Sequence, residues 1–411
     1  MPESPLHTIW ADKVLRLTGI LMVLQGALVC SFGPYVSVLA VRQFGLGNRG
    51  FAVMIVASTL VSVTAAIAAG IRADQTADRR SIALWSSVAM LLGAALMTFL
   101  PGTVVFVLAH ALIFPLSTLF GQLFAQSRLA AQAYPPATRD GILTTIRALF
   151  AAPFVVVLPL WSLALNHGAA VLSIYPVAVV LSAVMLVITA RTWPKVGATQ
   201  WHDAPSGLSL RQALAELANP ALALRIVALG AVSAGGTMTF AVIGLVLTPE
   251  VGRGAGDVAL YAGLVAGLEV PFMLLVPFVI PHFRRTHLIL TGTAIYALQM
   301  VFLTPLAGSS WLWLLLLPGA MGGAITLTLP IAYLQDQLAH RPGTGAALMA
   351  LQKVAGDAMA ATAFAIGTTL SGYGFAAVIG ASVTVLGAAV LVWADRAVQV
   401  PKNPGPASAS N

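Results

Sequence analysis

Residues 142–164 read ILTTIRALFAAPFVVVLPLWSLA, an apolar run with one charged residue, Arg147, inside it. A second run, GAALMALQKVAGDAMAATAFAIGTTL at residues 345–370, carries Lys353 at the corresponding depth, 206 residues later. A membrane core about 30 Å thick needs about 20 apolar residues at 1.5 Å each. Because lipid offers no partner for free backbone N–H and C=O groups, both runs are predicted to be membrane-spanning helices.

The rest of the chain repeats this plan in two halves. Arg79-Arg80 and Arg284-Arg285 lie 205 residues apart, and Pro101 and Pro305 lie 204 apart. A duplicated helical membrane protein with ionisable groups at matching depths is typical of secondary transporters. Charged or turn-rich breaks divide the chain into twelve predicted spans, at roughly 15–40, 51–71, 81–100, 103–126, 142–164, 169–190, 224–248, 258–280, 288–306, 311–333, 345–370 and 375–394.

The composition agrees with an integral membrane protein. The chain is 59% hydrophobic and 8% charged, whereas a soluble domain is about 25% charged. With a cytoplasmic N-terminus, sixteen of the 21 Lys and Arg residues fall on the inner side, and only Arg42, Arg49 and Arg253 fall on the outer side. This asymmetry predicts that both termini are cytoplasmic. It also explains the net charge of +8 by topology, so we expect no nucleic-acid partner.

The widest break between spans divides the chain into two sets of six. We predict an N-terminal six-helix bundle over residues 1–190, a cytoplasmic linker over 191–222 and a C-terminal six-helix bundle over 223–396. Residues 397–411 are rich in Pro, Ser and Ala, a composition typical of a disordered tail. The predicted fold class is therefore an all-α integral membrane protein with twelve spans.

Enzymatic classes find no support in the sequence. The seven His residues are scattered without metal-ligand spacing, and no Gly-rich phosphate loop ending in Lys-Ser or Lys-Thr is present. We therefore expect neither an enzyme nor a nucleotide-driven pump, and no cofactor or metal site.

The loop between spans 2 and 3 carries a recognisable motif. It contains Gly70 and Asp74, followed by Asp78, Arg79 and Arg80. This pattern resembles the cytoplasmic loop motif of the major facilitator superfamily, in which a carboxylate at a helix end and neighbouring Arg groups form a gate. The sequence departs from the motif where Gln replaces the usual basic residue after the first Asp and Ala replaces the second Gly.

Several further segments resemble the sugar efflux transporter family within that superfamily: Gly121–Ala125 with Arg128, Ile146–Ala148, Leu163–Gly168, Ala266–Pro271, Tyr333–Asp336 and Gly343–Gly345. The resemblance implies the major facilitator fold, two six-helix bundles related by a pseudo-twofold axis. It also implies a monomer in a bacterial inner membrane that exports sugars or galactoside-like molecules with protons as the coupling ion. Span 5 departs from many antiporters, because Pro153 and Pro159 are not preceded by Gly.

Charged residues within the spans are the candidates for coupling. Each costs about 2.5–3.5 kcal/mol at the bilayer centre on insertion scales, so it must face an aqueous cavity or a partner. Lys353 and Asp357 are spaced i, i+4 and share one helix face. In the fold that the chain resembles, spans 5 and 8 meet at the seam between the halves, as do spans 2 and 11, which suggests a pair between Arg147 and Glu269. Glu269 is the first candidate for the proton site and Asp357 the second. The alternative is that both pairs are static and fix helix packing.

Polar uncharged side chains within the spans are candidates for substrate binding. Gln25, Gln122 and Gln352 lie on spans that normally line the cavity of this fold, and amides match the ring hydroxyls of sugars. Interhelical hydrogen bonding without a ligand explains each of them equally well. His110 in span 4 is a further candidate, either as a proton relay or as a structural donor.

A drug–proton antiporter is the alternative function. Its cavity would favour lipophilic cations through acidic and aromatic side chains. Here Arg147 and Lys353 offset Glu269 and Asp357, a balance that favours neutral sugars.

Overall fold

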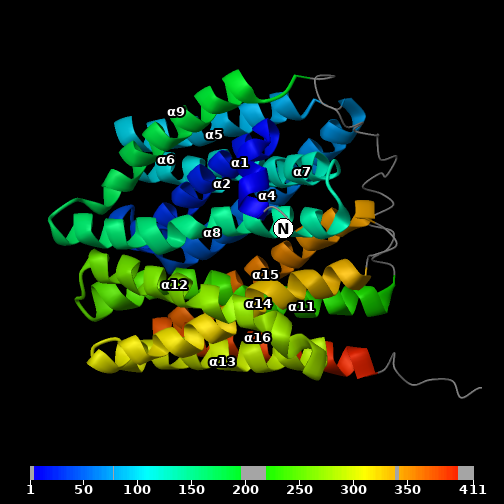
Figure 1. The fold of residues 1–411 in the computed structure, drawn as a ribbon. Coiled ribbons are helices and arrows are strands. Elements are labelled where there is room, and N and C mark those ends of the chain that lie inside the picture. Colours follow the sequence, from blue (N-terminus) through cyan, green and yellow to red (C-terminus); the bar gives the residue numbers. More distant parts are fainter. Residues whose placement is uncertain (1–3, 77, 196–218, 338–341, 397–411) are drawn as a thin grey trace, which may run out of the picture.

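The computed structural model describes residues 4–76, 78–195, 219–337 and 342–396. Every regular element within these ranges is a helix (Figure 1), and eleven helices are long and apolar enough to cross a membrane. The central part of the predicted linker, residues 196–218, and the predicted tail, residues 397–411, lie outside the described residues.

Helices of the first half form the blue-to-green group in Figure 1. They are α1 Pro5–Ala11, α2 Lys13–Phe32, α3 Val36–Val38, η1 Leu39–Gln43, α4 Gly47–Thr76, α5 Arg79–Phe99, α6 Thr103–Val107, η2 Leu108–Ile113, η3 Phe114–Leu116, α7 Leu119–Ala131, α8 Pro136–Asn166, η4 Val171–Ser173 and α9 Ile174–Thr192.

Helices of the second half form the green-to-red group. They are α11 Pro220–Leu245, η5 Val246–Glu250, α12 Ala255–Val279, η6 Ile280–His282, α13 Arg285–Leu306, η7 Ser310–Leu315, α14 Leu316–Gln337, α15 Pro342–Leu370 and α16 Tyr373–Arg396. The predicted span at residues 345–370 corresponds to α15. This helix is long enough to span, and it is absent from the eleven apolar helices because Lys353 and Asp357 lower its hydropathy.

Two predicted spans are less regular than the sequence suggested. The span predicted at 15–40 is interrupted after Phe32, because Pro34 has no backbone N–H to continue the helix; α3 and a π-helical turn, η1, follow. The span predicted at 103–126 is divided by the π-helical η2 and by a short 3₁₀ turn that contains Pro115. A third π-helical turn, η5, ends the first helix of the second half. Such turns widen an α-helix locally and are frequent at functional sites.

Side-chain caps define where several helices begin. Asp12 precedes α2 and its Oδ1 accepts the N–H groups of Val14 and Leu15, at 2.8 and 2.9 Å. Asn219 precedes α11 and accepts the N–H of Ala221 at 3.0 Å. Each cap satisfies N–H groups that have no partner within the helix. The two caps lie at the start of the first long helix of each half.

Packing within each half follows the same plan. α2 packs along α8 and α5 along α9, while in the second half α11 packs along α15 and α13 along α16. The closest approaches also correspond, because Gly26 lies against the carbonyl of Phe150, and Gly230 lies against the carbonyl of Gln352. Between the halves, α8 packs against α12 and α4 against α15. These two pairs of helices are called the seam below.

The close packing of α11 on α15 predicts that substitution of two glycines of α11 by alanine has different effects on stability. A Cβ at Gly230 would lie 2.9 Å from both the Gln352 carbonyl oxygen and the Ala355 Cβ, whereas a Cβ at Gly236 would have no atom within 4 Å. Gly230→Ala should destabilise the protein by about 1–3 kcal/mol through overpacking. Gly236→Ala should be neutral or stabilising by up to about 1 kcal/mol, because Ala is the better helix former.

Thermal unfolding of the two purified variants in one detergent checks this prediction. The melting temperature should fall for Gly230→Ala and stay level or rise for Gly236→Ala. Equal melting temperatures would contradict a backbone contact at Gly230.

Candidate functional site

All four predicted intramembrane charges lie on helices of the seam. Arg147 belongs to α8, Glu269 to α12, and Lys353 and Asp357 to α15. Because α8 contacts α12 and α4 contacts α15, spans 5 and 8 and spans 2 and 11 meet as the resemblance implied. The seam therefore contains charged groups whose contacts can depend on how the halves are arranged.

Asp357 is the most completely hydrogen-bonded of these groups. Its side chain is buried, and Lys353 Nζ lies 2.6 Å from Oδ2, the pair that the i, i+4 spacing predicted. The Thr59 hydroxyl of α4 donates to the same oxygen at 2.5 Å, and the Thr237 hydroxyl of α11 donates to Oδ1 at 2.6 Å. A buried carboxylate is tolerated only with such partners. Asp357 thus joins three helices, one of which belongs to the opposite half.

Sequence reasoning did not find Thr59 or Thr237. Hydroxyls in apolar helices usually bond to a carbonyl of the preceding turn, as Thr293 does with the carbonyl of Ile289 at 2.7 Å. A Thr that instead serves a distant carboxylate looks the same in the sequence. The signal available for Thr59 was its place on span 2, which was expected to meet span 11.

Glu269 lies in different surroundings. Its side chain is half-buried, and Oε1 packs directly on Gly323 of α14, where any Cβ would overlap the carboxyl. Within the described part of the chain, Glu269 has no ion pair and no side-chain hydrogen bond. Because Gly323 has no side chain, the Glu269 carboxyl fits against it. That carboxyl has no hydrogen-bond or ion-pair partner in the described part of the chain.

Arg147 does not form the predicted pair with Glu269. Its guanidinium lies over the ring of Phe124 in α7, 4.7 Å from the ring centroid, and its side chain is exposed. Among the described residues, no carboxylate lies within ion-pair distance of it. The physical reason is direction, because each side chain packs on a helix of its own half: Arg147 on α7 and Glu269 on α14. A cation over an aromatic face gains about 0.5–1 kcal/mol at an exposed site.

The three predicted glutamines are buried but differ in their partners. Gln122 accepts from Arg79 Nη1 at 3.5 Å, and Gln352 donates to the carbonyl of Leu229 at 3.5 Å. The Oε1 of Gln25 has no hydrogen-bond partner among the described residues. Gln122 and Gln352 thus have partners on neighbouring helices, and Gln25 keeps a buried acceptor without a partner among the described residues.

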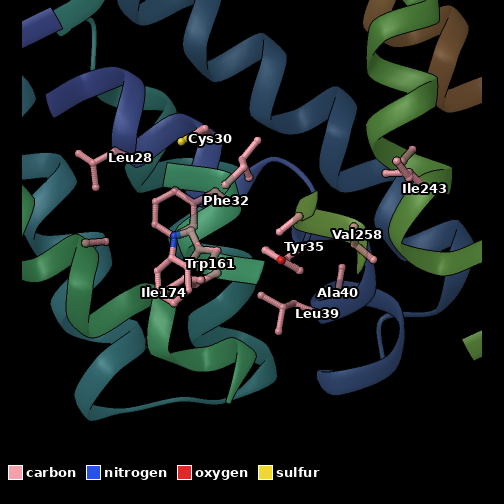
Figure 2. Packing of buried hydrophobic residues seen from close by; sticks show 14 of the residues in the cluster. Leu28, Cys30, Phe32, Tyr35, Leu39, Ala40, Trp161, Ile174, Ile243 and Val258 are labelled. Carbon is pink, nitrogen blue, oxygen red and sulfur yellow. The ribbon is translucent and has the colours of Figure 1, made fainter. Parts of the chain in front are cut away.

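His110 is part of the core of the first half rather than of the seam. Its Nε2 lies 2.9 Å from the hydroxyl of Tyr175, and the rings of Phe32, Phe106 and Phe114 surround it. Figure 2 shows Phe32 in this packed region beside Trp161. These contacts correspond to the structural-donor alternative, and they separate His110 from the other substrate-binding candidates.

The loop motif ties three helices of the first half together. Gly70 and Asp74 lie in the last turns of α4, and Asp78 caps α5 by accepting the N–H of Ser81 at 3.0 Å. The hydrogen bonds from Ser81, with Arg72 and Arg80 nearby, hold the pKa of Asp78 below its usual value. Arg80 Nη2 donates to the carbonyl of Ala190 near the end of α9 at 2.8 Å, and Arg79 reaches Gln122 on α7.

The halves are also joined at the ends of the seam helices that lie away from the loop motif. The sequence did not predict these contacts. The Tyr35 hydroxyl donates to the carbonyl of Ala255 at the start of α12, at 3.0 Å. The Tyr373 hydroxyl at the start of α16 donates to Asn48 Oδ1 in α4, also at 3.0 Å. Tyr35 lies close to the buried Val258 in Figure 2. We call these two bonds the tyrosine contacts.

Glycines bring the backbones together at the same end. A Cβ at Gly244 of α11 would lie 2.7 Å from the carbonyl oxygen of Pro34, and Gly256 of α12 leaves room for the side chain of Asn166. Among the described residues, the side-chain hydrogen bonds between the halves include the tyrosine contacts, the bond from Ser37 to the carbonyl of Phe240 and the Thr59–Asp357 bond. Arg42 of η1 also interacts with Tyr373 and Glu250 at this end. The halves are therefore closed against each other from the middle of the seam to this end.

The arrangement of helices in this chain is similar to that of several solved structures. No family model and no curated protein matches the sequence. Among solved structures, a variant of the nucleoside transporter NupG has a TM-score of 0.75 at 15% identity and covers 93% of this chain and 100% of its own. A D-xylose–proton symporter has a TM-score of 0.69 at 15% identity, with 92% and 96% covered.

An auto-inhibited POT family peptide transporter has a TM-score of 0.70 at 12% identity, with 95% of this chain and 99% of its own covered. At these identities the likeness concerns the fold. The chain thus has the major facilitator fold, an all-α integral membrane fold of two six-helix bundles.

Proposed function

We propose that this protein is a secondary active transporter that moves sugars or galactoside-like molecules across a bacterial inner membrane, coupled to protons. Both termini lie in the cytoplasm in this proposal, and the protein acts as a monomer. The half-buried carboxyl of Glu269, which has no fixed partner in the described part of the chain, carries it. In this proposal, a half-buried carboxyl on a seam helix binds or releases a proton as its access to water changes with the arrangement of the halves. Such a change is what coupling to a proton gradient requires.

Alternating access is supported by how the two halves contact each other. Within a half, glycines bring helix backbones into contact, whereas the halves are joined by a few hydroxyl bonds and glycine contacts from the middle of the seam to one end. The asymmetry of basic residues assigns that end to the outside. In this proposal the structure is the state that is closed to the outside, and the tyrosine contacts form its outer gate.

The substrate class follows from the balance of charge at the seam. Asp357 is neutralised by Lys353, and the exposed Arg147 offsets Glu269. A lipophilic cation would meet two cations here and a single carboxylate without a fixed partner. A neutral polar molecule meets donors and acceptors without a net charge, and Gln25 offers a further free acceptor. Two proteins with this fold, a nucleoside transporter and a D-xylose–proton symporter, take substrates of this polar kind.

Export is the direction that the resemblance to sugar efflux transporters implies. In inside-out vesicles with an acid lumen, an exporter that exchanges protons for sugar accumulates sugar in the lumen. The drug–proton antiporter remains the second candidate, and it would accumulate a cationic dye under the same gradient.

Glu269→Gln should abolish sugar accumulation driven by the pH gradient, by at least about tenfold, because an amide cannot bind the coupling proton. Labelled lactose and thiogalactoside in inside-out vesicles provide the measurement. Asp140→Asn is the matched control, because Asp140 is an exposed carboxylate near the start of α8, and it should accumulate sugar like the parent protein. Sugar accumulation by Glu269→Gln would exclude Glu269 as the coupling group. Dye accumulation without sugar flux would favour the drug antiporter.

Removing both tyrosine hydroxyls should open the outer gate more often. Each neutral hydrogen bond contributes about 0.5–1.5 kcal/mol, so Tyr35→Phe with Tyr373→Phe should raise the open population about 5- to 150-fold. The measurement is labelling of Val258→Cys by a membrane-impermeant maleimide added from outside. Cys30, the single native cysteine, is replaced by Ala in this background.

Tyr261→Phe is the matched control for the gate. Its hydroxyl accepts from Gln299 at 3.0 Å within the second half, so its loss should leave the labelling rate within about twofold of the parent. Equal labelling of the double variant and the parent would show that the tyrosine contacts do not hold the gate closed.

A further inference from the structure

Asp357 is held by donors from both halves of the protein, and each of its oxygens has different partners. Oδ1 accepts from Thr237, which belongs to the same half. Oδ2 accepts from Lys353 on its own helix and from Thr59 on α4 of the other half. One of the three hydrogen bonds of this carboxylate therefore crosses the seam, and two do not.

The two bonds within the half are fixed by close helix packing. α11 and α15 approach so closely that a Cβ at Gly230 would lie 2.9 Å from the Gln352 carbonyl oxygen, and a Cβ at Gly356 would lie 2.6 Å from the Gly230 carbonyl oxygen. Thr237 lies two turns after Gly230 on α11, and Asp357 follows Gly356 on α15. Helices in backbone contact move together, so Thr237 stays beside Asp357 when the halves rearrange.

Among the described glycines, none brings the backbones of α4 and α15 together beside the bond that crosses the seam. Thr59 lies in the middle of α4, and both Thr59 and Asp357 are buried. Towards the outer end, the same two helices are joined by an edge-to-face contact between Phe51 and Phe364, with ring centroids 5.4 Å apart. Any separation of α4 from α15 breaks the Thr59 bond and leaves the other two bonds in place.

We propose that Thr59 is a positioning residue of the transport cycle, whose hydroxyl holds the seam at mid-depth in the outward-closed state by bonding to Asp357. Thr237 and Lys353 keep the carboxylate aimed at Thr59 in every state. The proposal rests on the alternating access proposed above, and it adds that one buried carboxylate loses a partner when the halves part. Asp357 is thus an anchor for the conformational change, and Glu269 retains the coupling role.

Two matched substitutions separate this role from ordinary packing. Thr59→Val and Thr237→Val each remove one hydroxyl from the same carboxylate without changing side-chain shape much. Loss of the Thr59 bond destabilises only the closed state, whereas loss of the Thr237 bond destabilises both states equally and shifts nothing between them.

The measurement is again external maleimide labelling of Val258→Cys in the Cys30→Ala background. A hydrogen bond to a charged group corresponds to about a tenfold population change, so Thr59→Val should raise the labelling rate about tenfold. Thr237→Val should stay within about twofold of the parent, and Thr59→Ser, which keeps the hydroxyl, should restore the parent rate. Equal rates for Thr59→Val and Thr237→Val would overturn the proposal.

A double-mutant cycle keeps the test decisive if one variant folds poorly. When Asp357→Ala is present, adding Thr59→Val should raise labelling by much less than tenfold, because the side chain that accepts the Thr59 bond is already absent. Independent effects of the two substitutions would overturn the proposal.

Labelling requires no substrate, so the outcome is separate from the sugar assay. A shift in labelling without sugar flux would leave the role of Thr59 intact and reject the sugar transporter. Sugar flux that depends on Glu269, together with equal labelling of the two Thr variants, would support the sugar transporter and reject the role of Thr59.

Discussion

A charge inside an apolar solvent must be paired or hydrogen-bonded by groups of the protein, and the arrangement of helices around Asp357 follows from that constraint. Three donors from α4, α11 and α15 converge on one buried carboxylate. Each donor alone contributes little, but an unpaired charge at this depth would be strongly unfavourable. The carboxylate thus fixes which helices meet in the middle of the seam and in which register.

The same constraint acts differently within and between the halves. Within a half, helices are joined by backbone contact through glycines such as Gly26 and Gly230, and such contacts tolerate little sliding. Between the halves, glycine contacts such as that of Gly244 on the Pro34 carbonyl occur together with single hydroxyl bonds, and one hydroxyl bond is easily exchanged for a bond to water. The contacts that join the halves therefore include polar groups that can be broken one at a time.

Much of this fold could be predicted from hydropathy and charge. The twelve spans, the all-helical class and the Lys353–Asp357 pair follow from run length, from the absence of backbone partners in lipid and from helical spacing, all of which are local. The breaks near Pro34 and Pro115 were not predicted, although proline has no backbone N–H to continue a helix. The π-helical turns beside them were not predicted either, because a π turn has no residue signature.

The interior of the site was less accessible to sequence reasoning. Arg147 and Glu269 lie on helices that meet, yet the direction of each side chain depends on neighbours such as Phe124 and Gly323 that are remote in sequence. His110 was identified as polar in an apolar span, but its Tyr175 partner comes 65 residues later. Residue type identified the polar residues within the spans. Their partners, however, are set by contacts with residues that are distant in the sequence.

The π-helical turns η1 and η5 occur at corresponding places, each after the first long helix of its half and beside the contact between α3 and α11. A π turn accommodates one residue more than an α turn, so it changes the path of the backbone at that point. The likeness of the two halves therefore extends beyond the order of their helices to the local winding of the backbone.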